Sequence, residues 1–253
     1  MNLPRRALFA ALPAFCASSA QVDEATSFLA ESERRTGGRI GVYARNLATG
    51  RELSWRADER FVMCSTFKMS LVACVLSRAD KGEEQLGRFV HYSTAQISNY
   101  APVARRHLAD GGMTVEAMCQ AAIEVSDNTC ADLLLTSVGG PAGLTRFWRG
   151  EGDAVTRLDH TEPRLNFSPP GDPRDTATPG AMAGDLQRFL LGDALSPSSR
   201  ARLTGWMLNC QTGGALLRAG LPKGWKVADK TGNNGKDALG DIAVAWPALA
   251  LQL

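Results

Sequence analysis

The chain has 253 residues, of which 44% are hydrophobic and 21% charged, and its formal net charge is only +2. This composition is ordinary for a soluble globular protein and long enough for one large domain or two interlocked ones. It contains no cationic stripe, acidic tail, internal repeat or low-complexity segment, so nucleic acid is not an expected partner.

The first twenty residues have the pattern of an export signal. Arg5 and Arg6 form a basic start, residues 7–15 an apolar stretch, and Ala17-Ser18-Ser19-Ala20 a small-residue cleavage zone. The apolar stretch is too short to span a bilayer. We therefore expect a mature chain without a membrane span, periplasmic or secreted, by the general or the twin-arginine route. A frayed amphipathic N-terminus is the alternative.

A helix and two strands are predicted next. Residues 22–35 carry apolar residues at helical spacing and are followed by Gly37-Gly38, which favours a helix stop. Residues 40–46 and 51–55 have strand character and are joined by the turn Ala48-Thr49-Gly50.

The middle of the chain is mainly helical and the end returns to strands. Helices are predicted over 67–77, 115–125, 129–136 and, after a Ser196-Pro197 cap, up to about 208. Segment 67–77 is apolar on most sides, which is typical of a buried central helix. Strands are predicted over 225–230 and 241–246.

This order predicts a discontinuous α/β domain with an all-α domain inserted into it. We expect residues 1–20 to be the signal, 21–60 and 213–253 to form the α/β domain, and 61–212 the all-α domain with the loop that carries Glu162. A functional site would lie at the junction of the two domains, which is a common place for a ligand cleft.

One short motif carries chemistry. Ser65-Thr66-Phe67-Lys68 places a hydroxyl and an ammonium three residues apart, and such residues share a helix face. Serine is a poor nucleophile unless a neighbour removes its proton. An S-x-x-K pair alone is weak, because about one arises by chance in a chain of this length, and a capping serine followed by a solvated lysine is the commoner arrangement.

Three further motifs strengthen the interpretation of Ser65 and Lys68 as a catalytic pair. Ser126-Asp127-Asn128, the stretch from Glu162 to Asn166 and Lys230-Thr231-Gly232 follow in order. With S-x-x-K, the chain resembles a class A serine β-lactamase from its N-terminal helix to about Pro247. The resemblance implies a β-lactamase/transpeptidase-like fold, an antiparallel sheet flanked by helices with an inserted helical domain. It also implies a small β-lactam substrate, a monomer and no cofactor.

The resemblance implies roles for single residues. Ser65 would be the nucleophile, and either Lys68 or Glu162 the base for acylation, a choice that stays open. Glu162 and Asn166 would direct the water that hydrolyses the acyl-enzyme, and Ser126 would relay a proton to the leaving nitrogen. The implied substrate contacts are Asn128, Lys230, Thr231, Gly232, the backbone N–H of Asn233 and an aromatic wall from Tyr100. Arg218 is either a second positive group near the substrate carboxylate or an ion-pair arginine.

Two other functions remain open. A penicillin-binding D-Ala-D-Ala peptidase carries S-x-x-K and K-T-G but lacks the glutamate that matches Glu162, and would deacylate β-lactams slowly. The second alternative is an inactive remnant, because relatives continue after the position of Pro247 through a further strand and a terminal helix. This chain ends at Leu253, so we expect low solubility or a low melting temperature.

No metal site is expected. His91, His107 and His160 are well separated, without metal-ligand spacing, which excludes a zinc-dependent β-lactamase.

The six cysteines do not match the family's pairs. Cys16 falls in the signal, and the other five cannot all pair. By resemblance, Cys119 would need a partner two positions before Cys74, and Cys64 a partner at Asn234. We assign no pairing and expect mostly buried free thiols.

His160 departs from the family. The resemblance implies an arginine there, paired with the aspartate that matches Asp175 to pin the loop carrying Glu162. Because histidine is charged only part of the time, we expect a looser loop, slower deacylation and more tolerance of bulky cephalosporins.

Overall fold

The computed structural model describes residues 19–248. The export signal, Cys16 and the end of the chain from Leu249 were subjects of prediction but lie wholly or largely outside the described residues. The helices within them are α1 (Ser19–Thr36), α2 (Phe67–Asp80), α3 (Val115–Glu124), α4 (Asn128–Ser137), α5 (Gly140–Gly150), α6 (Pro179–Leu186), α7 (Pro197–Leu208) and α8 (Leu217–Gly220). No helix among the described residues is long and apolar enough to cross a membrane.

The N-terminal helix and the hairpin are both present as predicted, and the helix packs on the hairpin. α1 contacts β2 (Glu52–Trp55), which pairs antiparallel with β1 (Val42–Arg45). Ala25 and Leu29, four residues apart on one helix face, are buried. Gly37 has a positive φ of 68° and donates its N–H to the Glu33 carbonyl at 2.8 Å, so the glycine ends the helix as the sequence indicates.

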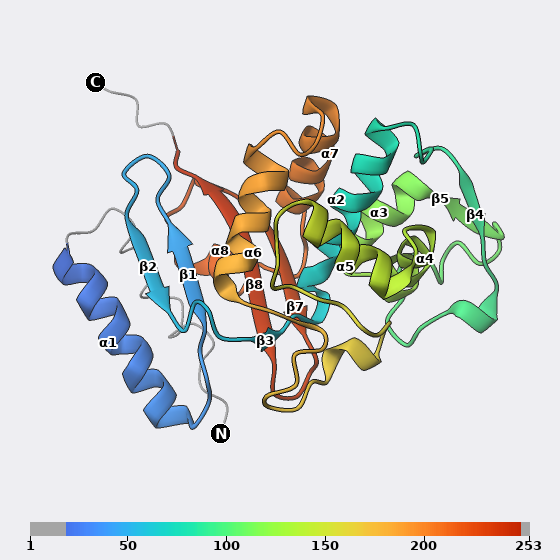
Figure 1. Ribbon diagram of the computed structural model, residues 1–253. Helices are drawn as coiled ribbons and strands as arrows, with labels where there is room; N and C mark the ends of the chain where they lie inside the picture. Colours follow the sequence, from blue (N-terminus) through green and yellow to red (C-terminus); the bar gives the residue numbers. More distant parts are fainter. Residues whose placement is uncertain (1–18, 249–253) are drawn as a thin grey trace.

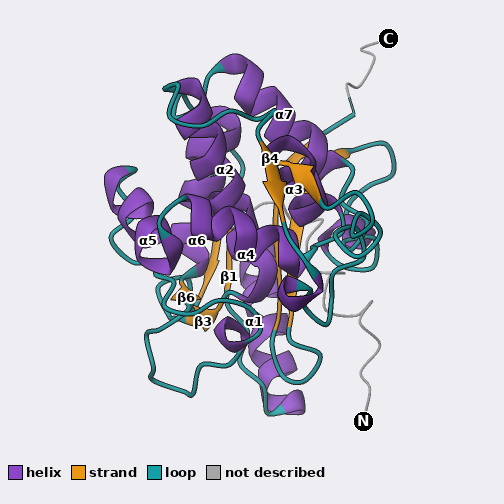
Figure 2. Cartoon of the chain, turned by 90° about the vertical axis from the view of Figure 1, so that its right-hand side faces the viewer, coloured by secondary structure: helices purple, strands orange, loops and turns teal. Residues whose placement is uncertain are grey.

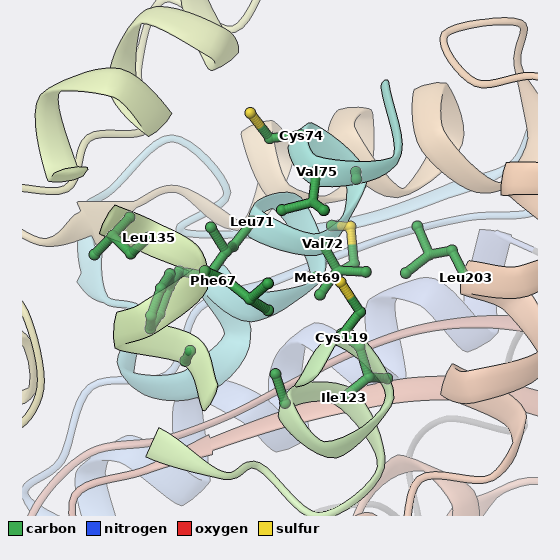
Figure 3. Close-up of a cluster of buried hydrophobic side chains, with 14 of the residues drawn as sticks. Phe67, Met69, Leu71, Val72, Cys74, Val75, Cys119, Ile123, Leu135 and Leu203 are labelled. Carbon is green, nitrogen blue, oxygen red and sulfur yellow. The ribbon is translucent and has the colours of Figure 1, made fainter. Parts of the chain in front are cut away.

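α2 is the central helix of the molecule. Figure 3 shows its apolar side chains within a cluster of buried residues. The helix contacts α3, α4, α5 and α7. Its residues from Phe67 to Ser77 are all buried, so the all-round apolar pattern is explained by helices on every side.

A long antiparallel pair lies between the hairpin and the helices (Figure 1). β7 (Lys226–Asn233) pairs with β8 (Leu239–Trp246), with Gly232 opposite Gly240. α7 packs on β7, and α6 contacts both β8 and β1. Figure 2 looks onto the helical side, where helices fill most of the face.

The strands form separate pairs instead of one sheet. Within residues 19–248, no ladder joins β1–β2 to β7–β8. Two short pairs complete the set: β3 (Phe61–Val62) with β6 (Thr176–Ala177), and β4 (Phe89–His91) with β5 (Gly112–Thr114).

All five described cysteines are free and buried. In Figure 3 the Cys74 sulfur points out of the apolar cluster, whereas Cys119 lies inside it. Burial raises the pKa of the Cys74 thiol to about 11 and that of Cys64 to about 12. These thiols are therefore protonated and act as small apolar groups, as expected.

Candidate active site

Ser65 lies in a turn that is pressed against β7. It belongs to a 3-10 turn, Cys64–Thr66, and α2 begins directly after it at Phe67. Cys64 has a positive φ of 45°, a strained conformation for a non-glycine residue. A Cβ added at Gly232 would lie 2.5 Å from the Met63 carbonyl oxygen and 3.1 Å from the Ser65 amide nitrogen. Glycine at this position is thus required by the close approach of strand and turn.

Lys68 is fully buried behind Ser65. Its Nζ donates to the Asn128 Oδ1 at 2.5 Å and to the Ser126 carbonyl at 2.9 Å, and lies 3.4 Å from the Ser126 Oγ. Burial lowers the pKa of Lys68, while the Glu162 carboxylate opposes that shift. Among the described residues no hydrogen bond joins Lys68 to the Ser65 hydroxyl, although the motif spaces the two residues only three apart.

Glu162 faces Lys68 from a separate loop, residues 159–175, called the Glu162 loop below. The Glu162 Oε1 lies 3.4 Å from the Lys68 Nζ, and both side chains are buried. The Oε2 accepts from the Asn166 amide at 2.6 Å. Oε1 is buried without a hydrogen-bond partner among the described residues, so it keeps an acceptor position facing the lysine.

Lys230, at the centre of β7, contacts the same serine, Ser126, as Lys68 does. Its Nζ donates to the Ser126 Oγ at 3.1 Å and to the Thr231 carbonyl at 2.8 Å. Burial, together with the charge of Lys68, lowers the pKa of Lys230 to about 7. Ser126 therefore sits between two buried amines, and its φ of 62° shows a strained backbone.

Tyr100 lies at the exposed rim of this arrangement. About half of its surface is exposed (51%), unlike a core residue. Its carbonyl accepts from the Asn128 amide at 3.0 Å. Asp127 caps α4 through Cys130 and also accepts the amides of Val103 and Ala104, so it holds the Tyr100 segment against the helix.

Two predicted residues do not join the buried group. Asn233 ends β7, is exposed, and accepts the Gly235 amide at 2.6 Å. Arg218 forms an ion pair with the buried Asp229 and donates to the carbonyl of Cys210 at 3.1 Å. The ion-pair interpretation of Arg218 is therefore the one that the structure favours.

His160 contacts Asp175, the aspartate that the family resemblance pairs with an arginine. Its Nδ1 lies 2.6 Å from the Asp175 Oδ2, and Asp175 Oδ1 accepts the amides of Asp159 and His160 at 2.8 and 2.9 Å. Asp175 is buried, so one carboxylate joins both ends of the Glu162 loop. Within residues 19–248 no cluster of His, Cys, Asp or Glu could hold a metal ion.

Comparisons with known proteins agree with these motifs. A model of the β-lactamase enzyme family matches residues 24–250. An ancestral (GNCA) class A β-lactamase is 55% identical over 88% of this chain and 85% of that one, with a TM-score of 0.85. The putative class A β-lactamase PenP from Rhodopseudomonas palustris is 50% identical, with the same coverages and TM-score. The chain belongs to the class A β-lactamases.

Sequence reasoning missed two residues at the site of this class A β-lactamase. The Asp132 Oδ1 accepts the Glu162 amide at 3.1 Å, and burial raises the pKa of Asp132 to about 6. Asp132 follows Asn128 by one helical turn, a spacing that could have suggested a shared face. The Thr212 Oγ1 lies 2.6 Å from the Thr231 Oγ1, and no sequence signal points to that contact.

The turn after β7 also contacts the Glu162 loop. The Asn234 Nδ2 donates to the Asn166 carbonyl at 3.1 Å and to Asp237 at 2.8 Å. Its Oδ1 accepts the amides of Lys236, Asp237 and Ala238. One side chain thus shapes the hairpin turn and ties it to the loop.

Proposed function

We propose that this chain hydrolyses the β-lactam ring of penicillins and cephalosporins through a serine acyl-enzyme and so gives antibiotic resistance. The observation that carries this is the buried contact between Lys68 and Glu162 at 3.4 Å, directly behind the Ser65 turn. A base for the nucleophile and a carboxylate for hydrolysis are then both within one site.

In the first step, the Ser65 oxygen attacks the lactam carbonyl carbon and loses its proton to Lys68 or to Glu162. Backbone N–H groups of Ser65 and Asn233 would hold the oxyanion, and losing one such donor typically costs about 3–4 kcal/mol. Ser126 gives a proton to the leaving nitrogen as the C–N bond breaks. Its contacts with both Lys68 and Lys230 support this relay, because either amine can return a proton to it.

In the second step, Glu162 takes a proton from a water that attacks the acyl-enzyme. The bond from Asn166 to Oε2 leaves Oε1 as the acceptor for that water. The ester bond to Ser65 then breaks, and the serine recovers its proton. A peptidase without this carboxylate would remain acylated, so the buried position of Glu162 favours hydrolysis over the peptidase alternative.

Substrate recognition is assigned to the surrounding groups. Lys230 and the Thr231 hydroxyl would hold the substrate carboxylate by charge-assisted hydrogen bonds. Asn128 would bind the side-chain amide, and the exposed Tyr100 ring would line the entrance. We also propose that the chain acts as a monomer outside the cytoplasm, in the periplasm or secreted.

Steady-state turnover of a chromogenic cephalosporin tests the proposal, together with mass spectrometry of the enzyme. Ser65→Ala should neither turn over nor gain mass. Glu162→Ala should accumulate one acyl group per enzyme and lose about 10²–10⁴-fold in turnover. Asp172→Asn, on the same loop but paired with Arg174, is the control and should keep its rate.

Three results would count against the proposal. Unchanged turnover in Glu162→Ala would remove the assigned role of that carboxylate. A wild-type acyl-enzyme that persists for hours would support the peptidase alternative. Folded wild-type protein without turnover would support the inactive alternative.

A further inference from the structure

A cavity of about 480 Å³ lies away from the proposed active site. One wall is α5, which is labelled in Figure 1, and the other is the segment 157–159 at the start of the Glu162 loop. None of the residues proposed for catalysis or β-lactam binding lines it.

The lining is positively charged. Arg146 and Arg149 come from α5, and Arg157 and Asp159 from the opposite wall. Arg157 and Asp159 pair through two hydrogen bonds, from Nε to Oδ2 at 2.9 Å and from Nη2 to Oδ1, so they neutralise each other. The two α5 arginines leave the cavity with a net charge of +2.

Neither α5 arginine forms a salt bridge within residues 19–248, although the charge of Arg149 helps to lower the pKa of the buried Asp153. Arg149 donates to the backbone carbonyls of Asp153 and Thr156, the latter at 2.8 Å, which fixes its side chain. Arg146 is exposed and forms no ion pair among the described residues. The Arg146 guanidinium is therefore the positive group of the cavity that an anion would neutralise.

The start of α5 adds to the positive field. Pro141 and Ala142, in its first turn, line the cavity. The Arg146 guanidinium folds back toward this turn, because its Nη2 would lie 3.4 Å from a Cβ added at Gly139. The helix has 11 residues, and its positive N-terminal end lies beside the Arg146 guanidinium.

We propose that this cavity binds a small organic phosphate, a dianionic phosphate monoester with an apolar group. The charge of the phosphate matches the net charge of the lining, and guanidinium forks bind phosphate oxygens in pairs. Pro141, Ala142 and Leu158 offer apolar surface for the organic group. The cavity volume falls in the usual range for small-molecule sites, roughly 300–1,000 Å³.

Calorimetric titration with phenyl phosphate tests the proposal on the whole protein. Wild type should bind one equivalent, and inorganic phosphate should bind more weakly because it lacks the ring. Arg146→Gln should weaken phenyl phosphate binding at least tenfold. Arg106→Gln removes an equal charge from an exposed arginine that has no ion pair among the described residues and does not line the cavity, so its affinity should equal that of wild type.

Three results would overturn the proposal. Arg146→Gln could bind phenyl phosphate as tightly as wild type, which would exclude the Arg146 guanidinium from the binding site. Arg106→Gln could weaken binding as much as Arg146→Gln, which would indicate general attraction of anions. Acylation of Ser65 by a β-lactam could abolish binding, which would place the phosphate beside Lys230. Because the readout is binding itself, failure here is separate from failure of the β-lactamase proposal.

Discussion

Lys230 carries a charge that depends on its surroundings more than on its own chemistry. Its ammonium is held by a hydroxyl and a carbonyl and has no carboxylate partner among the described residues. Burial and the neighbouring Lys68 lower its pKa to about 7. Below pH 7 the amine is therefore charged and would attract the substrate carboxylate proposed for it, and above pH 7 the free enzyme would progressively lose this attraction.

We predict that kcat/KM for a carboxylate-bearing β-lactam falls above pH 7, by up to about tenfold per pH unit, because kcat/KM reports ionisations of the free enzyme. A pH profile from 6 to 9 measures this. Lys230→Arg keeps its charge, so its basic limb should move out of this range even if its rate is lower. Identical basic limbs in both proteins would assign the ionisation to another group.

Gly232 illustrates a residue whose size matters for packing. A Cβ there would stand 2.5 Å from the Met63 carbonyl oxygen, so Gly232→Ala must push β7 away from the Ser65 turn. We expect a loss of about 1–3 kcal/mol in the free energy of unfolding, as for overpacked cores, and a drop of tenfold or more in kcat/KM.

Gly240 provides the matched control, since it lies opposite Gly232 in the ladder. A Cβ at Gly240 would meet only the Thr66 Cγ2, at an ordinary 3.5 Å. Gly240→Ala should therefore leave stability and activity nearly unchanged. Chemical denaturation and steady-state kinetics of both variants decide the matter, and equal losses in the two would refute the packing argument.

At the scale of elements, polar side chains hold the Glu162 loop at several points. Asp175 joins its two ends, Asp132 holds the Glu162 amide, and Asn234 holds the Asn166 carbonyl. Loops generally move more readily than the helices around them. The rate of deacylation should therefore respond to changes in these anchors more than acylation does.

His160→Arg tests one anchor. Arginine is always charged and grips a carboxylate with a planar fork, whereas His160 offers Asp175 a single ring nitrogen, so the substitution should tighten the pairing and speed deacylation severalfold. Acyl-enzyme lifetime by stopped-flow mass spectrometry measures this. The control is His107→Arg, whose exposed pair with Asp110 at 2.7 Å lies outside the Glu162 loop. If His160→Arg leaves the lifetime unchanged, the loop is not limited by this pair.

For the whole molecule, stability depends on the helices around α2. Leu71 is fully buried there, whereas 55% of Leu47 is exposed in the β1–β2 turn. We predict that Leu71→Ala lowers the free energy of unfolding by about 2–5 kcal/mol, a large share of the roughly 5–15 kcal/mol of a typical domain. Leu47→Ala should change it by less than about 0.5 kcal/mol. Urea denaturation of both tests this, and similar midpoints would argue against a core centred on α2.

The strand pairs are the other feature at this scale. β1 and β8 each have one edge without a ladder partner among the described residues. Unpaired edges are sites of association between chains.

The division into residues 21–60 with 213–253 and residues 61–212 remains a prediction, as does the low melting temperature.

Local sequence determined most elements, because their signals are local. Apolar periodicity and the caps at Thr114, Asp127 and Ser196 set α3, α4 and α7 to within a few residues. α5 was missed, because Gly139, Gly140 and Pro141 look like breakers although proline is compatible with a first helical turn.

The family likewise followed from the sequence, since four short motifs in order are sufficient to recognise it. Only the tertiary structure decided several partners of those residues: Lys68 with Glu162, Thr231 with Thr212, and Arg218 with Asp229. The physical reason is the distance along the chain between the residues in contact. Spacing of three or four residues fixes neighbours on one helix, but contacts between residues far apart in the chain depend on how helices and strands pack.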